Sequence, residues 1–288
     1  MSYTGRFAPS PSGRLHYGSL ICALGSYLVA KHFHGRILLR IEDLDFYRCK
    51  KEYTTQIIEE LNSLGFEYDE PPYIQSEHTE VYEKAIKALL EKNKAFYCDC
   101  TRAKIKETPC TCYQRQQELD LSKPHSVRYR LDGIENIFDD FLQGKVKTTF
   151  NENTLVLKRA DGMIAYNLAC VVDDIRQGVT QVVRGSDLTD ITPAQMCLYK
   201  DFKAKDVSYL HLPLVLEDEK HKLSKQNLAK PVLDLDTKEN LLISALEFLG
   251  QDISRIYVNS GCKGILNKAI ESFDIKRINS LPKLCPYL

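Results

Sequence analysis

The hydrophobic residues near the start of the chain change from a short continuous run to a spacing of three and four. Residues 3–7 are typical of a strand, the spaced apolar residues predict a helix over residues 17–34, and the run at residues 37–41 predicts a second, buried strand. A strand, a helix and a strand in such close succession form a βαβ unit. Its strands are expected to be parallel and its crossover right-handed.

The same patterns predict further elements along the chain. Thr192 and Pro193 mark the start of a helix, with Thr192 as the N-cap and Pro193 in the first turn. Asp161 and Gly162 mark the turn of a hairpin. Helices are expected around residues 57–64, 79–92, 166–178, 239–249 and 263–273, and strands at residues 126–131, 154–158, 163–166 and 180–183.

The stretch after residue 93 differs from its surroundings because it is polar and rich in cysteine. It contains two close thiol pairs, Cys98 with Cys100 and Cys110 with Cys112. Two such pairs suit one tetrahedral Zn²⁺, which would stabilise a segment with few apolar residues. The spacing within each pair is one residue, which is shorter than usual. Four reduced surface thiols, or an oxygen ligand from Tyr113 in place of one thiol, therefore stay as alternatives.

These patterns predict the α/β fold class, with strand–helix units on both sides of an insertion. We expect a Rossmann-like domain with a parallel sheet, an inserted zinc-binding subdomain and a short C-terminal helical cap. The expected segments are residues 1–93 and 151–230 for the two halves of the Rossmann-like domain, 94–150 for the insertion and 231–288 for the cap.

A turn rich in proline, glycine and serine, residues 6–19, joins the first strand to the first helix. Free N–H groups and the dipole at a helix N-terminus favour negative charge, so this turn suits nucleotide phosphates. It lacks both the G-K-[ST] ending of a P-loop and the G-x-G-x-x-G of a dinucleotide fold. His16 and Gly18 instead offer an imidazole and a close backbone approach.

Two charged segments are expected near this turn. Glu42 follows the second strand, where acidic residues face the ligand crevice of an open α/β sheet. The loop at residues 222–226, KLSKQ, offers two lysines as a charge source for a polyphosphate. A solvated loop is the alternative interpretation for the lysine segment taken alone.

The composition narrows the class of protein. The chain of 288 residues has 39 basic and 39 acidic residues, which argues against a generally basic nucleic-acid coat protein. No apolar run has the length of a membrane span, and the N-terminus lacks a signal-peptide core. Ten cysteines, four of them clustered, are more typical of a cytoplasmic metal-binding protein than of a disulfide-bonded one. We therefore expect a cytoplasmic protein with no membrane partner.

Three motifs, in order, resemble those of class I aminoacyl-tRNA synthetases, and of the glutamyl enzymes in particular. RFAPSPSG at residues 6–13 resembles R-F-A-P-S-P-T-G, RIEDLD at residues 40–45 resembles R-I-E-D-T-D, and KLSKQ resembles the lysine-containing signature of the class. The likeness covers most of the chain, from Gly5 to about Asn227. It implies that ATP, with Mg²⁺, and L-glutamate form glutamyl-adenylate, and that the glutamyl group then passes to a tRNA.

The resemblance also implies roles for individual residues. Catalytic roles would fall on His16, Gly18 and Lys225, with Lys225 stabilising the departing pyrophosphate. ATP would be bound by Pro9, His16, Gly18, Ser19, Lys222, Ser224 and Lys225. Glutamate would be bound by Arg6, Phe7, Ala8, Pro9, Ser10, Glu42, Tyr166 and Arg184. Two guanidinium groups and one carboxylate match the two carboxylates and one ammonium of glutamate.

Departures from the glutamyl pattern indicate a smaller group. Cys170 ends the sequence YNLAC where ordinary glutamyl enzymes have Y-H-L-A-N, and only residues 227–288 follow the lysine signature, without an anticodon-binding domain. With its acceptor-type zinc insertion, the chain resembles the glutamyl-Q tRNA(Asp) synthetases, which attach glutamate to the queuosine base of tRNA(Asp). Their zinc site resembles C-x-C followed by Y-x-x-x-C. Cys98 and Cys100 match it, whereas Cys110 and Cys112 correspond only loosely to the second half.

Two alternative functions stay open from the sequence. One is glutamyl transfer to the terminal ribose of tRNA(Glu), and the other is a catalytically silent synthetase paralogue that acts as a binding protein. The intact Arg6, His16, Glu42, Arg184 and Lys225 argue against the silent paralogue. The expected partners are L-glutamate, ATP and tRNA(Asp), and the expected oligomeric state is a monomer.

Overall fold

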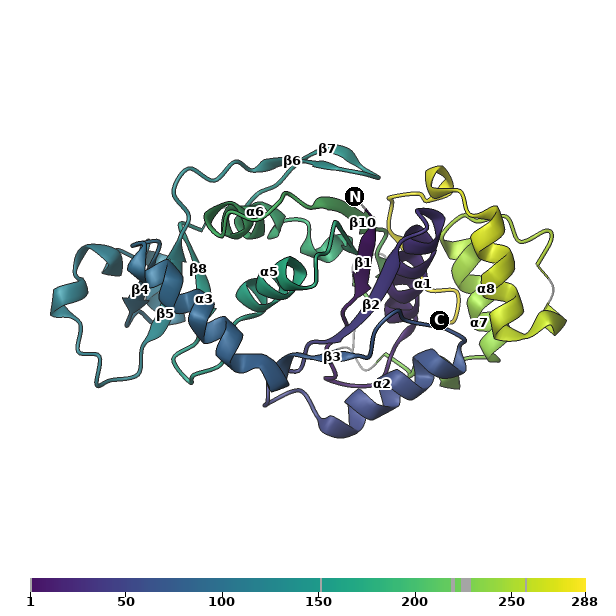
Figure 1. Cartoon of the computed structure of the whole chain (residues 1–288), viewed down its shortest axis with the longest axis horizontal. Helices are drawn as coiled ribbons and strands as arrows, with labels where there is room; N and C mark the ends of the chain where they lie inside the picture. The colour runs from purple at the N-terminus through teal and green to yellow at the C-terminus, as the bar shows by residue number, and fades with distance from the viewer. Residues whose placement is uncertain (1, 151, 219–220, 224–228, 257) are drawn as a thin grey trace.

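The computed structural model describes residues 2–150, 152–218, 221–223, 229–256 and 258–288, which form an elongated molecule around a central sheet (Figure 1). The main helices are α1 (Tyr17–His32), α2 (Lys51–Ser63), α3 (Thr79–Glu91), α4 (Arg102–Glu107), α5 (Tyr166–Arg176), α6 (Thr192–Asp201), α7 (Lys238–Phe248) and α8 (Gly261–Ser272). The strands are β1 (Thr4–Phe7), β2 (Arg36–Ile41), β3 (Tyr73–Ile74), β4 (Ala95–Cys98), β5 (Ser126–Arg130), β6 (Ile137–Asp140), β7 (Gly144–Lys147), β8 (Thr154–Lys158), β9 (Gln181–Gly185), β10 (Ser208–Leu212), β11 (Val215–Leu216) and β12 (Lys283–Leu284).

Parallel strands make up most of the central sheet. β1 pairs in parallel with β2, and β2 with β3, so the βαβ unit predicted at the start of the chain is confirmed. β10 pairs in parallel with both β9 and β6, and β7 adds an antiparallel edge. β1 and β9 lie side by side, and the Thr180 N–H donates to the Thr4 carbonyl at 2.9 Å. The carboxyl ends of β1, β2 and β9 therefore meet at one edge, where α/β sheets bind ligands.

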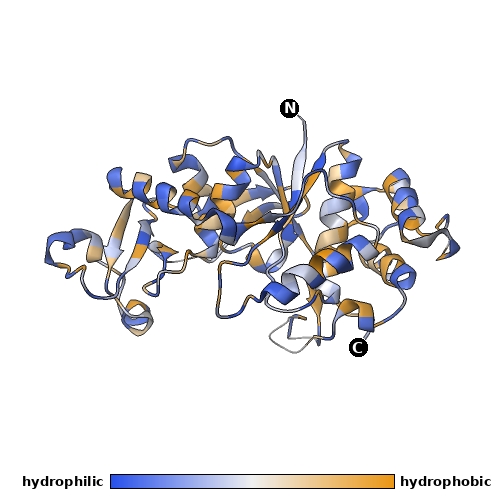
Figure 2. Cartoon of the chain, turned by 60° about the horizontal axis from the view of Figure 1, so that its bottom comes forward, coloured by the Kyte–Doolittle hydropathy of each residue, from blue (hydrophilic) through white to orange (hydrophobic). Residues whose placement is uncertain are grey.

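Helix α1 is buried on nearly all sides because it lies between the central sheet and the C-terminal helices. Its core-facing residues pack against β1, β2 and β9 on one side and against α7 and α8 on the other. Figure 2 shows hydrophobic residues concentrated along the central strands and the inner helix faces. Among the residues that the structure describes, no helix is long and apolar enough to cross a membrane.

A second core lies over an antiparallel sheet of β4, β5 and β8. Helices α3, α5 and α6 pack in it against these strands. The expected boundary at residue 150 divides the strands differently from their pairing. β8 follows that boundary yet pairs with β5, whereas β6 and β7 precede it and join β10. Local alternation predicts a strand but not its distant partner, so the sequence did not predict these pairings.

One local prediction is wrong, and another is only partly correct. The N-cap of α6 is Ile191, and the Thr192 hydroxyl donates to the Leu188 carbonyl at 3.1 Å instead of capping the helix. The expected hairpin around Gly162 forms with a short second arm: Lys158 and Ile164 make an antiparallel bridge, the Ala165 N–H donates to the Leu157 carbonyl at 2.9 Å, and the Arg159 N–H donates to the Met163 carbonyl at 2.8 Å. The second arm is short because α5 already begins at Tyr166.

Candidate active site

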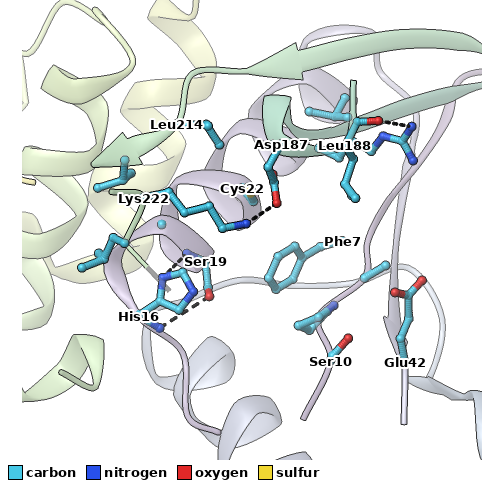
Figure 3. A pocket seen from close by; sticks show the side chains of 18 of the residues that line it. Phe7, Ser10, His16, Ser19, Cys22, Glu42, Asp187, Leu188, Leu214 and Lys222 are labelled. Carbon is cyan, nitrogen blue, oxygen red and sulfur yellow. Dashed lines mark hydrogen bonds and ion pairs between the residues drawn. The ribbon is translucent and has the colours of Figure 1, made fainter. Parts of the chain in front are cut away.

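One cavity of about 300 Å³ opens at the carboxyl ends of β1, β2 and β9. Every described residue that the sequence assigned to ATP or to glutamate lines it. Figure 3 shows two sides of this cavity, with His16, Ser19 and Lys222 on one side, Ser10 and Glu42 on the other, and Phe7 between them. Ser224 and Lys225 lie outside the described residues. The cavity thus brings together residues from both halves of the chain.

Arg6 is fixed in the wall of the cavity by two buried partners. Its Nε donates to Asp174 Oδ1 at 3.1 Å and its Nη1 to the Val183 carbonyl at 2.9 Å. Although burial raises the pKa of Asp174, Arg40 and Arg6 hold it below its ordinary value, so this carboxylate is ionised. The Nη2 nitrogen of Arg6 has no partner among the described residues. It is therefore available to an anionic ligand, with the guanidinium already oriented.

Glu42 lies on the opposite side of this charge network. Its Oε1 accepts from Nη2 of the fully buried Arg40 at 3.3 Å, and Arg40 Nη1 also donates to Asp174 Oδ1 at 2.8 Å. Burial raises the pKa of Glu42 to about 7, and the charges of Arg40 and Arg6 only partly offset this effect. The guanidinium groups of Arg6 and Arg40 thus lie among the carboxyl groups of Asp174 and Glu42. A further cation beside Glu42 would favour its ionised form.

Arg184 is the second guanidinium in the cavity, and four groups hold it. It donates to His211 Nε2 at 3.1 Å, Gln195 Oε1 at 2.8 Å, Thr192 Oγ1 at 2.7 Å and the Leu188 carbonyl at 3.3 Å. Burial lowers the pKa of His211, so its ring is neutral. Since Nε2 accepts from Arg184, the ring proton lies on Nδ1, which donates to Asp140 Oδ2 at 2.8 Å. This chain of contacts leaves little freedom for the guanidinium to turn.

His16 is the N-cap of α1 and takes part in a capping box. Its Nδ1 accepts from the Ser19 N–H at 3.3 Å, so in the neutral ring Nε2 carries the proton. A Cβ on Gly18 would lie only 3.0 Å from His16 Cε1, which explains the glycine there. The cap thus fixes the ring beside the cavity, at a helix end that favours anions.

Lys222 reaches the cavity from the loop after β11. Its ammonium forms an ion pair with Asp187, which lies just after β9 (Figure 3). Both side chains are partly exposed, so solvent weakens the pair and an incoming phosphate can compete for the lysine. The cavity therefore has one polyphosphate-compatible side and one side lined by the Arg6, Glu42 and Arg184 groups.

The residues that position the two arginines were missed in the sequence. They are Asp140, Asp174, Gln195 and His211, all buried. A signal for Asp174 was present, because it follows closely on the apolar run at residues 168–172 of α5. A signal for His211 was present too, since it interrupts an apolar strand. Neither signal identifies the residue that the side chain contacts, because that residue is distant in the sequence.

The four clustered cysteines lie together at the far end of the molecule. Their sulfur atoms are all within 4.8 Å of one another, with Sγ–Sγ distances of 3.5 Å between Cys98 and Cys110 and 3.4 Å between Cys100 and Cys112. Two thiolates on one tetrahedral Zn²⁺ stand roughly 3.8 Å apart. Three of the four buried residues in this small core are cysteines. The arrangement fits a structural metal that replaces a hydrophobic core.

Tyr113 has other contacts in this segment. Its hydroxyl accepts from Gln114 Nε2 at 3.2 Å, and its ring lies 4.6 Å from the Arg130 guanidinium carbon. Four thiols already complete a tetrahedral set, so an oxygen ligand is not needed.

Comparisons with known proteins agree with this geometry. The family model of the class I tRNA synthetases (E and Q), catalytic domain, matches residues 3–257. A glutamyl-Q tRNA(Asp) synthetase from Photobacterium profundum is 40% identical over 288 residues, covering 98% of this chain and 91% of the relative. One from Vibrio parahaemolyticus is 41% identical over 291 residues, covering 99% and 97%. The crystal structure of a glutamate tRNA ligase from Elizabethkingia meningosepticum has a TM-score of 0.81 at 24% identity and covers 100% of this chain and 68% of that chain. This last likeness concerns the fold alone.

Proposed function

Because the chain belongs to the class I tRNA synthetases (E and Q) and, within them, to the glutamyl-Q tRNA(Asp) synthetases, we propose that it activates L-glutamate with ATP and transfers it to the queuosine base of tRNA(Asp). The observation that carries this proposal is the single cavity with a phosphate-compatible side and a side suited to glutamate. Glutamyl transfer to tRNA(Glu) and a silent paralogue are the competing outcomes.

The glutamate side supplies a partner for each charge of the substrate. Arg6 and Arg184 each face one carboxylate, and Glu42 faces the ammonium together with the Tyr166 hydroxyl. Phe7, Ala8, Pro9 and Ser10 line the same side and exclude water from it. Because Asp174 and the His211–Asp140 pair already fix the two arginines, little conformational freedom is lost on binding.

The chemistry needs position and charge rather than a general base. A carboxylate oxygen of glutamate attacks the α-phosphorus of ATP, the bond to the β-phosphate oxygen breaks, and pyrophosphate leaves with its electron pair. His16 Nε2 and Lys222 stabilise negative charge on the phosphates, and Pro9, Gly18 and Ser19 line the path of the nucleotide. The proposed roles of Ser224 and Lys225 follow from the lysine signature. Mg²⁺ is the expected companion of ATP.

Cys98, Cys100, Cys110 and Cys112 are proposed to hold one structural Zn²⁺. The metal supplies cross-linking rather than catalysis, because the cysteines belong to a core separate from the active site. We also propose that the enzyme works as a monomer in the cytoplasm, where its tRNA substrate is found.

Glutamate-dependent exchange of labelled pyrophosphate into ATP tests the activation step. We expect exchange with L-glutamate and at least tenfold less with glutamine or aspartate, because each lacks one of the matched charges or the matched length. Absence of exchange with glutamate, in the presence or absence of tRNA, would support the silent paralogue.

The raised pKa of Glu42 predicts a pH dependence of glutamate binding. With a pKa of about 7, most of the free protein carries a protonated Glu42 at pH 6, whereas the substrate ammonium requires the carboxylate. Binding should therefore release close to one proton at pH 6 and almost none at pH 8, and the Kd should rise about tenfold per pH unit below 7. Calorimetry in buffers of different ionisation enthalpy measures the released proton. Equal proton release by a Glu42→Gln variant would assign it to another group.

A further inference from the structure

Two aromatic side chains, Phe46 and Tyr47, lie exposed beside the active site. They are 60% and 67% exposed, and their ring centroids lie 4.5 Å apart with the planes inclined at 44°. They belong to the turn between β2 and α2, which begins just after Glu42. Burial of large aromatic rings away from water is favourable. A pair that an ordered turn holds in solvent therefore indicates a ligand that covers it.

The turn that carries the two rings is held by its own hydrogen bonds. Arg48 Nε donates to Asp45 Oδ2 at 2.7 Å, and the Cys49 N–H donates to the Asp45 carbonyl at 2.7 Å. The Lys50 N–H donates to the Pro11 carbonyl at 3.0 Å, which ties the turn to the phosphate-binding segment. The rings are thus presented by a preorganised turn.

The same turn borders a second cavity that adjoins the active site. This cavity of about 340 Å³ shares Ser10, Glu42 and Tyr166 with the first cavity, and Asp45 and Arg48 come to it from the turn. A group in the second cavity would therefore lie next to the activated glutamate. Phe46 and Tyr47 lie between Asp45 and Arg48 in the turn and therefore stand beside the second cavity.

Basic side chains accompany the aromatic pair. Arg48, Lys50 and Lys51 follow it directly in the sequence, and Arg159 lines the second cavity from the segment after β8. Arg48 and Arg159 form partly exposed ion pairs with Asp45 and Asp161. Solvent weakens such pairs, so both guanidinium groups can also bind RNA phosphates.

We propose that Phe46 and Tyr47 form a stacking platform for an unpaired nucleobase that flanks the acceptor nucleotide in the anticodon loop. This inference rests on the proposed function, because the acceptor base must reach the activated glutamate, and the second cavity shares Ser10, Glu42 and Tyr166 with the active site. Bases in single-stranded loops are splayed out and stack on aromatic rings, while basic groups follow the backbone. Two rings surrounded by basic residues suit this ligand better than a protein partner, whose interface would need a wider apolar centre.

Removal of both rings tests the platform by kinetics. The double variant Phe46→Ala, Tyr47→Ala should raise KM for tRNA(Asp) about 5- to 100-fold, as expected for lost base stacking, and leave glutamate-dependent pyrophosphate exchange unchanged. Phe141→Ala is the matched control, because Phe141 is 53% exposed near the starts of β9 and β10, at the opposite edge of the sheet. An unchanged KM in the double variant would overturn the inference.

A fluorescent reporter tests the contact directly, because the chain contains no tryptophan. In a Phe46→Trp variant, an RNA hairpin with the anticodon stem and loop of tRNA(Asp) should quench the emission, whereas a Phe141→Trp variant should not respond. Unchanged emission from the Phe46→Trp variant, while filter binding detects the bound hairpin, would contradict stacking. The titration involves no glutamyl transfer. A failure of the proposed reaction would therefore appear as lost glutamylation with the quench intact.

Discussion

A Glu42→Gln substitution is expected to lower kcat/KM for glutamate roughly 30- to 5,000-fold while the protein stays at least as stable. The loss follows because the buried ammonium of the substrate would face a neutral amide instead of a carboxylate, a change that typically costs about 2–5 kcal/mol. The free protein, in contrast, gains from losing a buried charge. Pyrophosphate exchange at pH 8 and thermal unfolding measure the two effects.

The sign of the stability effect follows from the raised pKa of Glu42. The folded-state pKa of about 7 lies above the ordinary value of 4.5, so stability contributed by the protonated group is lost as the pH rises through 7. The glutamine variant is neutral at every pH and should avoid this loss. Glu52→Gln is a suitable control, since Glu52 is an exposed residue of α2. Unchanged kinetics for glutamate in the Glu42 variant would show that Glu42 does not bind the substrate ammonium.

A Cys98→Ser substitution is expected to reduce bound zinc from one atom per chain to nearly none. Structural zinc contributes on the order of 10 kcal/mol to small domains, and this segment has almost no other core. We therefore also expect protease cleavage between residues 99 and 125 to increase at least tenfold. Metal analysis and limited proteolysis measure these outcomes.

Cys262→Ser provides the matched control for the metal site. Cys262 is a partly exposed cysteine of α8, in a different core from the cluster. Its replacement should leave the zinc content and the proteolysis of the segment unchanged. Full zinc occupancy in the Cys98 variant would show that Cys98 is not a ligand and that other groups bind the metal.

The first part of the fold was predictable because its signals are local. The apolar run of β2, the periodic residues of α1 and the turn between β1 and α1 each lie within a few residues of one another. Their order in the chain also places Glu42 and the turn at the same edge of a parallel sheet. The structure brings His16, Glu42 and Arg184 to one cavity, as this order indicates.

The rest depended on contacts between distant segments. Asp140 belongs to a strand that precedes His211 by seventy-one positions, and no local pattern links them. Asp174 orients Arg6 across 168 positions, also through a buried contact. In the sequence, Asp140 resembles an ordinary surface position, and the apolar run before Asp174 does not identify Arg6 as its partner. Only packing makes these two carboxyl groups positioning groups for the arginines.

The acceptor of the glutamyl group is the central claim, and mapping the attached label tests it most directly. The protein is incubated with ATP, Mg²⁺ and labelled glutamate, together with tRNA(Asp) that carries queuosine or guanosine in the anticodon. The RNA is then cleaved so that the anticodon fragment separates from the 3′ fragment. We predict label on the anticodon fragment of the queuosine form alone. Label on the 3′ fragment, or label on tRNA(Glu) instead, would contradict the account.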